Sequence, residues 1–333
     1  MEEKRIKVLT LGDMPLSTSG VGNQSKYMIE ALLKSGKFEV FSLGGAMKHP
    51  QYQLIKTEEW GDLWRVLPVD QFGTKEMVRS IIWKEKPDIV WFMTDPRFWG
   101  WLWEMDNEIR QNVPMVYYHV WDNYPYPKFN KKFYESNDVI ATISKLTDDI
   151  VRTVAPDVET HYIPHAVNTD IFKKLDKDIV EKLRGENKGP DGRDLSDRFV
   201  VLFNSRNARR KHSGTLIFWF KEFLERVGDD NAVLLMHTEP LDPNGPNLMQ
   251  IIEDLELDKG QVLFSRDKID ERQIATLYNI ADVTVNISDA EGFGLSCLES
   301  LACETPVVAV RTGGLQDQIT DGENVFGAII EPS

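Results

Sequence analysis

Short apolar runs alternate with longer amphipathic stretches along the first half of the chain. The stretch 23–36 carries Met28, Ala31 and Leu32 at helical spacing and closes with Gly36, a residue that commonly ends helices. The apolar runs have the length of buried strands: 7–12, 38–43, 88–93, 114–120 and 138–144. Because strands and helical patterns alternate, we expect a parallel sheet covered by helices.

The alternation stops at GENKGPDGRDLSD (185–197), which has three glycines, a proline and many charges. It then restarts with a helical pattern at 214–228 and with further apolar runs: 199–204, 232–238, 261–267, 282–288 and 305–310. We therefore predict an α/β protein of two doubly wound domains facing each other across a cleft. The expected parts are 1–185, a linker 186–197, and 198–333, with the closing helix of the second domain missing from this chain.

Composition narrows the class of protein. The chain has 333 residues, of which 41% are hydrophobic and 28% charged, and a formal net charge of −14. This negative balance argues against general affinity for nucleic acid or anionic lipid. The longest apolar runs have five residues, far below the roughly 20 that span a bilayer. The two cysteines, Cys297 and Cys303, are six positions apart in a predicted helix and cannot pair, so we expect a reducing cytoplasm.

A glycine turn between two carboxylates follows the strand candidate 282–288. In DAEGFGLSCLES (289–300), Glu291 and Glu299 flank Gly292 and Gly294 at a predicted strand–turn–helix junction. The free amides at a helix N-terminus attract phosphate, and glycines let the backbone approach it. The carboxylates could accept hydrogen bonds from hydroxyls on either side of a diphosphate, the layout of a nucleotide sugar. The alternative is that Glu291 is an ordinary acid near a helix start and Glu299 a solvated helix residue.

The stretch EGFGLSCLE (291–299) resembles the E-x7-E signature of family-4 glycosyltransferases, which have the GT-B fold of two Rossmann-like domains. The segment ACETPVVAVRTGGLQDQITDGENVFGAII that follows is also similar. The resemblance implies that Glu299 holds the nucleotide ribose and that Glu291 contacts the transferred sugar as a catalytic residue. It also implies that amides near Gly294, Leu295 and Ser296 bind the distal phosphate. By the same resemblance, residues 1–185 are the acceptor-side domain and residues 198–333 the nucleotide-sugar-binding domain.

Two further donor-binding segments follow from the resemblance. In SRNARRKH (205–212), Arg206 and Lys211 match the arginine and lysine that family members carry there, and they would neutralise charge on the departing diphosphate. Gly20 and Gly22, in the loop PLSTSGVGNQ (15–24), match the family's phosphate-side glycine pair. The alternative for 205–212 is a solvated basic loop, and the alternative for 15–24 is a helix-capping turn.

His119 ends the strand candidate 114–120, where family members often have a histidine that contacts the donor sugar. The resemblance therefore makes His119 a catalytic candidate, with Asp122 and Asn123 as weaker acceptor-side candidates. A lone histidine at a strand end is otherwise more often structural. Nearby, Trp99 and Trp103 are four positions apart and favour packing over an acceptor platform.

The function implied is a retaining, metal-independent glycosyltransferase that moves a sugar from a nucleoside-diphosphate sugar to an acceptor. The only D-x-D, at 176–178, lies in a charged stretch, and no cofactor is expected. A nucleotide-sugar epimerase and a non-catalytic nucleotide-sugar binding protein are the alternatives. The donor base (UDP, GDP or ADP), the acceptor (saccharide, lipid, metabolite or modified DNA base) and the oligomeric state stay open.

Overall fold

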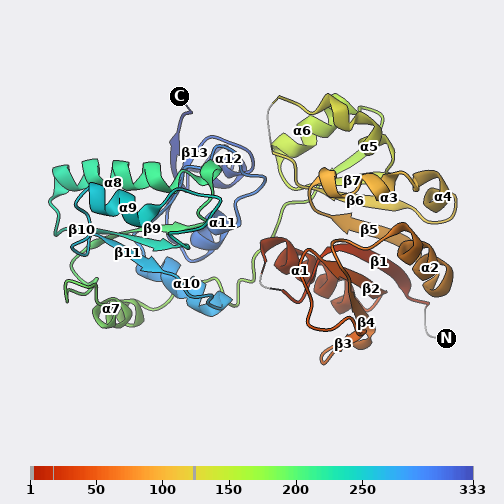
Figure 1. Ribbon diagram of the computed structural model, residues 1–333, viewed down its shortest axis with the longest axis horizontal. Coiled ribbons are helices and arrows are strands. Elements are labelled where there is room, and N and C mark those ends of the chain that lie inside the picture. Colours follow the sequence, from red (N-terminus) through yellow and green to blue (C-terminus); the bar gives the residue numbers. More distant parts are fainter. Residues whose placement is uncertain (1–3, 18, 123–124, 333) are drawn as a thin grey trace. The chain divides into compact units, whose positions relative to one another are not determined.

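The computed structural model describes residues 4–17, 19–122 and 125–332 (Figure 1). The chain divides into two compact units, Met1–Ala166 and Val167–Ser333, each built around its own sheet. None of the helices in the described ranges is long and apolar enough to cross a membrane.

The first unit contains an eight-stranded sheet in the order β3-β4-β2-β1-β5-β6-β7-β8. Neighbouring strands are parallel except β3, which pairs antiparallel with β4. The strands are β1 (Ile6–Asp13), β2 (Phe38–Gly45), β3 (Ile55–Thr57), β4 (Gly61–Pro68), β5 (Ile89–Met93), β6 (Met115–His119), β7 (Val139–Thr142) and β8 (Glu159–Tyr162).

Helices cover both faces of the first sheet because side chains alternate along each buried strand. Val8 and Val40 face α1, whereas Leu9 and Phe92 face the larger core beneath the other helices. The helices are α1 (Gly20–Lys34), α2 (Lys75–Glu85), α3 (Gly100–Trp103), α4 (Asp106–Arg110), α5 (Lys131–Glu135) and α6 (Lys145–Val154), with 3-10 turns Pro96–Phe98 and Lys128–Asn130.

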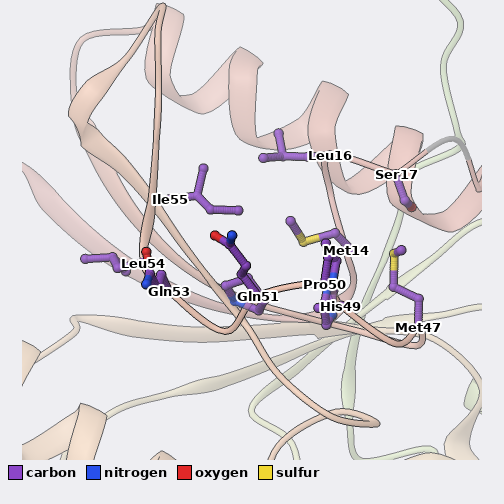
Figure 2. A pocket seen from close by; sticks show the side chains of 11 residues that line it. Met14, Leu16, Ser17, Met47, His49, Pro50, Gln51, Gln53, Leu54 and Ile55 are labelled. Atoms are coloured by element: carbon purple, nitrogen blue, oxygen red, sulfur yellow. The ribbon is translucent and has the colours of Figure 1, made fainter.

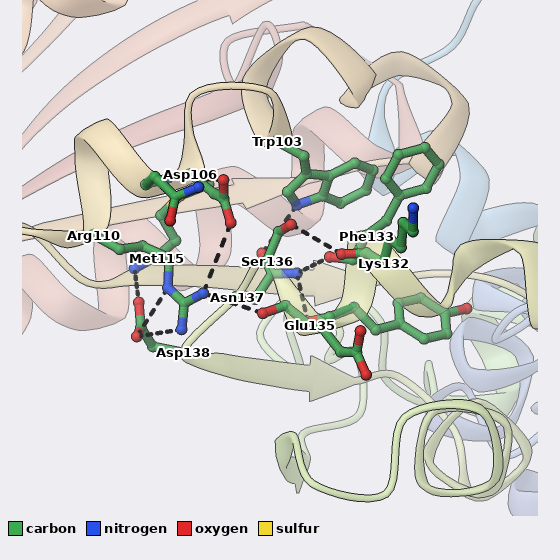
Figure 3. Close-up of polar contacts among 12 residues, drawn as sticks. Trp103, Asp106, Arg110, Met115, Lys132, Phe133, Glu135, Ser136, Asn137 and Asp138 are labelled. Carbon is green, nitrogen blue, oxygen red and sulfur yellow. Dashed lines mark hydrogen bonds and ion pairs between the residues drawn. The ribbon is translucent and has the colours of Figure 1, made fainter.

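The short helices α3 and α4 are fixed to the sheet by polar contacts (Figure 3). Trp103 donates its indole N–H to Asn137 at 3.1 Å. The guanidinium of Arg110 donates to Asp138, which also accepts the main-chain N–H of Met115 at 2.8 Å. Trp99 is fully buried and Trp103 is 3% exposed, which confirms packing as their role.

The second unit contains a six-stranded parallel sheet in the order β11-β10-β9-β12-β13-β14. Figure 1 shows α8 and α9 on one side of this sheet and α10 on the other. The strands are β9 (Phe199–Asn204), β10 (Ala232–His237), β11 (Val262–Ser265), β12 (Val283–Asn286), β13 (Val307–Val310) and β14 (Gly327–Ile330). The helices are α7 (Lys177–Glu186), α8 (Ser213–Val227), α9 (Leu248–Asp254), α10 (Glu271–Ile280), α11 (Leu295–Ala302) and α12 (Leu315–Ile319), with a 3-10 turn Arg209–Lys211.

The division between the units lies earlier than the boundary expected at residue 185. Residues 167–197 pack with the second unit: Leu183 contacts its core and Leu195 is only 2% exposed. Arg184 forms an ion pair of 2.6 Å with Asp282, ahead of β12. The segment 186–197 is therefore not a linker. It is a surface loop that Leu195 anchors, a single apolar side chain in an otherwise polar stretch.

Candidate functional site

The strand–turn–helix expected at residues 282–302 is present, with β12 ending at Asn286 and α11 beginning at Leu295. Gly294, with φ 89°, occupies the position before the helix, and a Cβ there would lie 2.4 Å from a methyl of Leu315. A Cβ on Gly313 would lie 1.9 Å from the carbonyl oxygen of Glu291, which accepts a hydrogen bond from the N–H of Gly314 at 3.0 Å. The turn 291–294 thus packs directly against the loop 313–315, and glycine is needed in both segments, at Gly294 and at Gly313.

Glu291 accepts hydrogen bonds from two cations of the basic segment 205–212. Its Oε2 contacts the ammonium of Lys211 and lies 3.0 Å from Nη1 of Arg210. The Lys211 and Glu291 side chains are only 7% and 13% exposed. A pair this well buried requires both partners, because either charge alone would be poorly solvated. The structure therefore brings Lys211 and Glu291 together, and it adds Arg210, which the sequence analysis did not single out.

Glu299 lies one turn into α11 and accepts a hydrogen bond of 2.7 Å from the hydroxyl of Tyr278. Tyr278 in turn accepts one of 2.7 Å from the amide of Asn204, at the end of β9. Burial raises the pKa of Glu299 to about 7 despite the Tyr278 hydrogen bond. Glu299 is therefore held directly by Tyr278 of α10, which Asn204 of β9 positions in turn, and this is not the environment of a solvated helix residue.

The first amides of α11 are available to a ligand. Cys297 and Leu298 donate their N–H groups back to Gly294 O, but the N–H groups of Leu295 and Ser296 donate to no group in the part of the chain that the structure describes. Unpaired amides at a helix start are suited to bind an anion. The following Cys297 is a free thiol, fully buried, and burial raises its pKa to about 12; Cys303 is also free and buried.

Arg206 is placed differently from Lys211. Its side chain is 66% exposed and pairs bidentately with Asp242, with Nε–Oδ2 2.7 Å and Nη2–Oδ1 3.2 Å. The hydrogen bonds to Asp242 raise the pKa of Arg206, and those from Arg206 hold the pKa of Asp242 below its usual range. Asp242 lies in the loop after β10, 36 positions along the chain, and no local pattern linked the two residues.

In the first unit, Gly20 and Gly22 form the first turn of α1, which Ser19 caps by accepting the N–H of Gly22 at 3.0 Å. A Cβ on Gly22 would lie 2.7 Å from the carbonyl oxygen of Met14. Packing of the loop against the helix start thus explains Gly22, whereas Gly20 is exposed. A phosphate-side role for either glycine remains a prediction.

His119 is fully buried at the end of β6, and both its ring nitrogens are engaged. Nδ1 lies 3.1 Å from the hydroxyl of Tyr117 and Nε2 lies 2.8 Å from that of Tyr134. Because Tyr117 donates its own proton to the carbonyl of Thr94, it accepts from Nδ1–H, and Nε2 accepts from Tyr134. Burial lowers the pKa of His119 to about 3, so the ring is neutral. In this arrangement the ring supports its neighbours and has no nitrogen left to contact a sugar.

The acceptor-side candidates are less well defined. Asp122 is partly buried just beyond β6, and Asn123 lies outside the described residues. Within those residues, no group of three or more His, Cys, Asp or Glu side chains is arranged to hold a metal ion.

Comparison with known proteins places the chain in a fold class. It aligns with sucrose-phosphate synthase from Thermosynechococcus elongatus at TM-score 0.78 and 18% identity, covering 99% of this chain and 86% of that one. It aligns with HepE from Anabaena, solved with UDP and glucose, at TM-score 0.72 and 17% identity, covering 98% and 86%. The fold is GT-B, with two Rossmann-like parallel-sheet units, as the sequence predicts.

The sequence comparisons agree with this class. Residues 189–333 match the family model of "Glycosyl transferases group 1". The chain is 43% identical over 185 residues to D-inositol 3-phosphate glycosyltransferase from Paenarthrobacter aurescens, covering 55% of this chain and 43% of that protein. It is 28% identical over 205 residues to a GDP-mannose-dependent phosphatidylinositol monomannoside mannosyltransferase from Mycolicibacterium smegmatis, covering 58% and 49%. The aligned parts span less than half of the length of either relative.

Proposed function

We propose that this protein is a retaining glycosyltransferase of family 4 that takes a sugar from a nucleoside-diphosphate sugar. The observation that carries the proposal is the start of α11, where the amides of Leu295 and Ser296, which have no partner among the described residues, lie between Glu291 and Glu299 in the sequence. An anion at the amides would place its flanking groups beside the two carboxylates. The match of residues 189–333 to group 1 glycosyl transferases supports it.

The proposed roles follow the chemistry of each group. Glu299 would accept hydrogen bonds from the ribose hydroxyls, and the α11 amides would bind the distal phosphate. Glu291, fixed by Lys211 and Arg210, would orient the transferred sugar. Lys211 would stabilise the charge that develops on the departing diphosphate. Arg206 would add to this once released from Asp242.

In the transfer step, the bond between the anomeric carbon and the phosphate oxygen breaks, and its electron pair leaves with the nucleoside diphosphate. The acceptor oxygen forms the new bond to the same face of the sugar, and its proton passes to the departing phosphate. No step requires a metal ion or an added cofactor. We place the reaction in the cytoplasm, in keeping with the two free thiols.

Calorimetric titration of the full chain with UDP, GDP, ADP and CMP tests the donor site. The relatives make UDP and GDP the first choices, since HepE was solved with UDP and the mannosyltransferase is GDP-mannose-dependent. We expect one nucleotide to bind selectively, and Glu299→Gln to weaken it about tenfold through loss of charged hydrogen bonds. Glu225→Gln on the exposed face of α8 is the control and should leave the affinity unchanged.

Turnover separates the remaining alternatives. A glycosyltransferase releases the nucleoside diphosphate only as the sugar is transferred, whereas an epimerase gives a new nucleotide sugar without acceptor. Chromatography of the donor after incubation, with and without acceptor, distinguishes the two enzymes. A purely binding protein would leave the donor unchanged in both cases. Failure of all four nucleotides to bind would reject the proposed donor site.

A further inference from the structure

The carboxyl edge of the first sheet carries a cavity of about 1120 Å³ that the donor chemistry does not use. Its walls come from the ends of β1, β2, β4 and β5, the edge at which parallel sheets bind ligands. A smaller cavity of about 390 Å³ lies nearby, between residues 14–17 and the loop 47–55 (Figure 2). The lining of the smaller cavity is mainly apolar, whereas the larger one combines charged and aromatic side chains.

Backbone strain is concentrated in the larger cavity. Of the seven non-glycine residues with positive φ in the described chain, three line it: Ala46 (64°), Gln71 (51°) and Thr94 (134°). Each lies just after a strand rather than at a helix end, where such values are ordinary. A β-branched residue at φ 134° is costly and persists only where its surroundings enforce it.

The surroundings do enforce these conformations. The N–H of Ala46 donates to the carbonyl of Gln71 at 2.6 Å, which ties two of the strained loops together. The carbonyl of Thr94 accepts the hydroxyl of Tyr117 at 2.7 Å. Tyr117 is itself held by His119. Strain maintained by a dedicated hydrogen-bond network is typical of a binding site.

One wall of the cavity is a rigid aromatic surface. Trp101 and the half-exposed Phe98 line it, and each packs on a buried ring: Trp101 lies 6.2 Å from Trp99 and Phe98 lies 5.1 Å from Phe72, measured between ring centroids. The contact of Trp103 with Asn137 fixes the helix α3 that carries Trp101. Such a wall can bury the apolar C–H face of a sugar ring at little entropic cost.

The charged groups of the cavity favour a neutral ligand. Asp13 is partly buried, and in the described chain its carboxylate accepts a single side-chain hydrogen bond, from Ser19 at 3.1 Å, which leaves acceptor capacity for hydroxyls. Asp70 adds a second carboxylate. The guanidinium of Arg97 is already paired bidentately with Asp95, with both contacts 2.8 Å. Lys48 alone would be a weak phosphate site in a cavity that also contains two carboxylates.

We propose that this cavity binds the acceptor, and that the acceptor presents a neutral, hydroxyl-rich ring, a saccharide or a cyclitol, to Asp13 and Trp101. This inference rests on the transferase function proposed above. It differs from what the name of the D-inositol 3-phosphate glycosyltransferase relative would suggest, since that acceptor carries a phosphate.

Saturation-transfer NMR on the full chain tests the proposal with matched probes. The neutral probes are maltose, cellobiose, methyl mannoside and myo-inositol, and the phosphorylated ones are glucose 6-phosphate and myo-inositol 1-phosphate. We expect saturable binding of at least one neutral probe, weakened about tenfold by Asp13→Asn and by Trp101→Leu. Trp83→Leu is the control, because Trp83 on α2 is 81% exposed and lies outside the cavity.

Three results would overturn the proposal: no saturable binding of any neutral probe, neutral binding that neither cavity variant changes, or a phosphorylated probe binding tenfold tighter than its neutral counterpart. Nucleotide affinity, measured on the same samples, reports on the second unit and on folding. Nucleotide binding without sugar binding therefore rejects the acceptor inference alone, and sugar binding without nucleotide binding rejects the proposed function.

Discussion

The hydroxyl of Tyr117 donates a 2.7 Å hydrogen bond to the carbonyl oxygen of Thr94, which holds this residue at φ 134°. The substitution Tyr117→Phe removes this hydrogen bond. It should lower the free energy of unfolding by about 1–2 kcal/mol and weaken binding of a neutral sugar probe, with nucleotide affinity unchanged. Urea denaturation and probe titration measure the two effects. Tyr118→Phe is the matched control, because its hydroxyl also donates to a carbonyl, that of Ile163 at 2.8 Å, but Ile163, unlike Thr94, does not line the cavity. Equal loss of probe binding in both variants would contradict the positioning role of Tyr117.

His119 offers a test between a sugar-contacting and a supporting role. In the supporting role, the ring nitrogens of His119 bond to Tyr117 and Tyr134 and do not contact the donor sugar. His119→Asn should then weaken binding of the neutral sugar probe and leave the ratio of the affinities for nucleotide sugar and free nucleotide unchanged. Calorimetry with both ligands gives this ratio. Because the pKa of His119 is about 3, the ring should also contribute no titration to the rate between pH 5 and 8. A fall in the ratio would restore the direct contact with the donor sugar that the family resemblance implies.

Glu299 should make the stability of the protein depend on pH in an unusual direction. Its folded-state pKa, about 7, lies above the ordinary 4.5, so the folded state binds the proton more tightly than the unfolded state. The stabilisation is fully present below the unfolded pKa and is lost as pH rises through 7. Between pH 8.5 and 5 the wild type should gain about 2 kcal/mol relative to Glu299→Gln. Denaturation at both pH values measures this, and Glu225→Gln should follow the wild type.

The buried pair of Lys211 and Glu291 should show strong coupling. Among the described residues, Lys211→Met leaves the buried carboxylate of Glu291 with Arg210 as its one cationic partner, and this change should cost about 3 kcal/mol. Adding Glu291→Gln removes the stranded charge, so the double variant should be more stable than the sum of the two single changes predicts. A double-mutant cycle in urea provides the coupling energy. If the stability losses of the two single variants simply add in the double variant, Lys211 and Glu291 are not energetically coupled.

Alanine substitutions at Gly313 and Gly36 distinguish the cost of a steric clash from the cost of backbone strain. Gly313→Ala places a Cβ 1.9 Å from the carbonyl oxygen of Glu291 and should cost several kcal/mol. Gly36→Ala also alters a glycine at positive φ, 74°, but its Cβ would meet nothing within 4 Å, so the expected cost is about 1 kcal/mol. Thermal unfolding compares the two. Equal costs would show that the turn moves freely away from the loop.

The buried strands and the glycine turn could be predicted because their signals are local. Strand β9 occupies 199–204 as expected, since a strand buried on both faces is an unbroken apolar run. Strand β8, Glu159–Tyr162, was missed because it lies at the sheet edge and its side chains are mostly exposed. Strand β4 was missed although it is central enough to bury Trp64 and Val66, because its polar positions interrupt the run.

The parts of the site that could not be predicted depend on contacts between distant segments. Arg206 was expected at a diphosphate, but its partner Asp242 comes from the loop after another strand. Nothing near Glu299 in the sequence points to Tyr278, and nothing near Thr94 reveals its φ of 134°. Residue type and spacing thus indicated which segments meet a ligand, whereas pairing among side chains decided which of them are already occupied.

The thiol of Cys297 lies on α11 between the two site glutamates and is fully shielded from solvent, with its pKa raised to about 12. A thiol-specific reagent can reach it only when the start of this helix opens, so its rate of modification measures local unfolding at the donor site rather than surface reactivity. Any nucleotide that binds the folded helix start slows that opening in proportion to its occupancy. The protein therefore carries, in its native sequence, an intrinsic reporter of ligand binding.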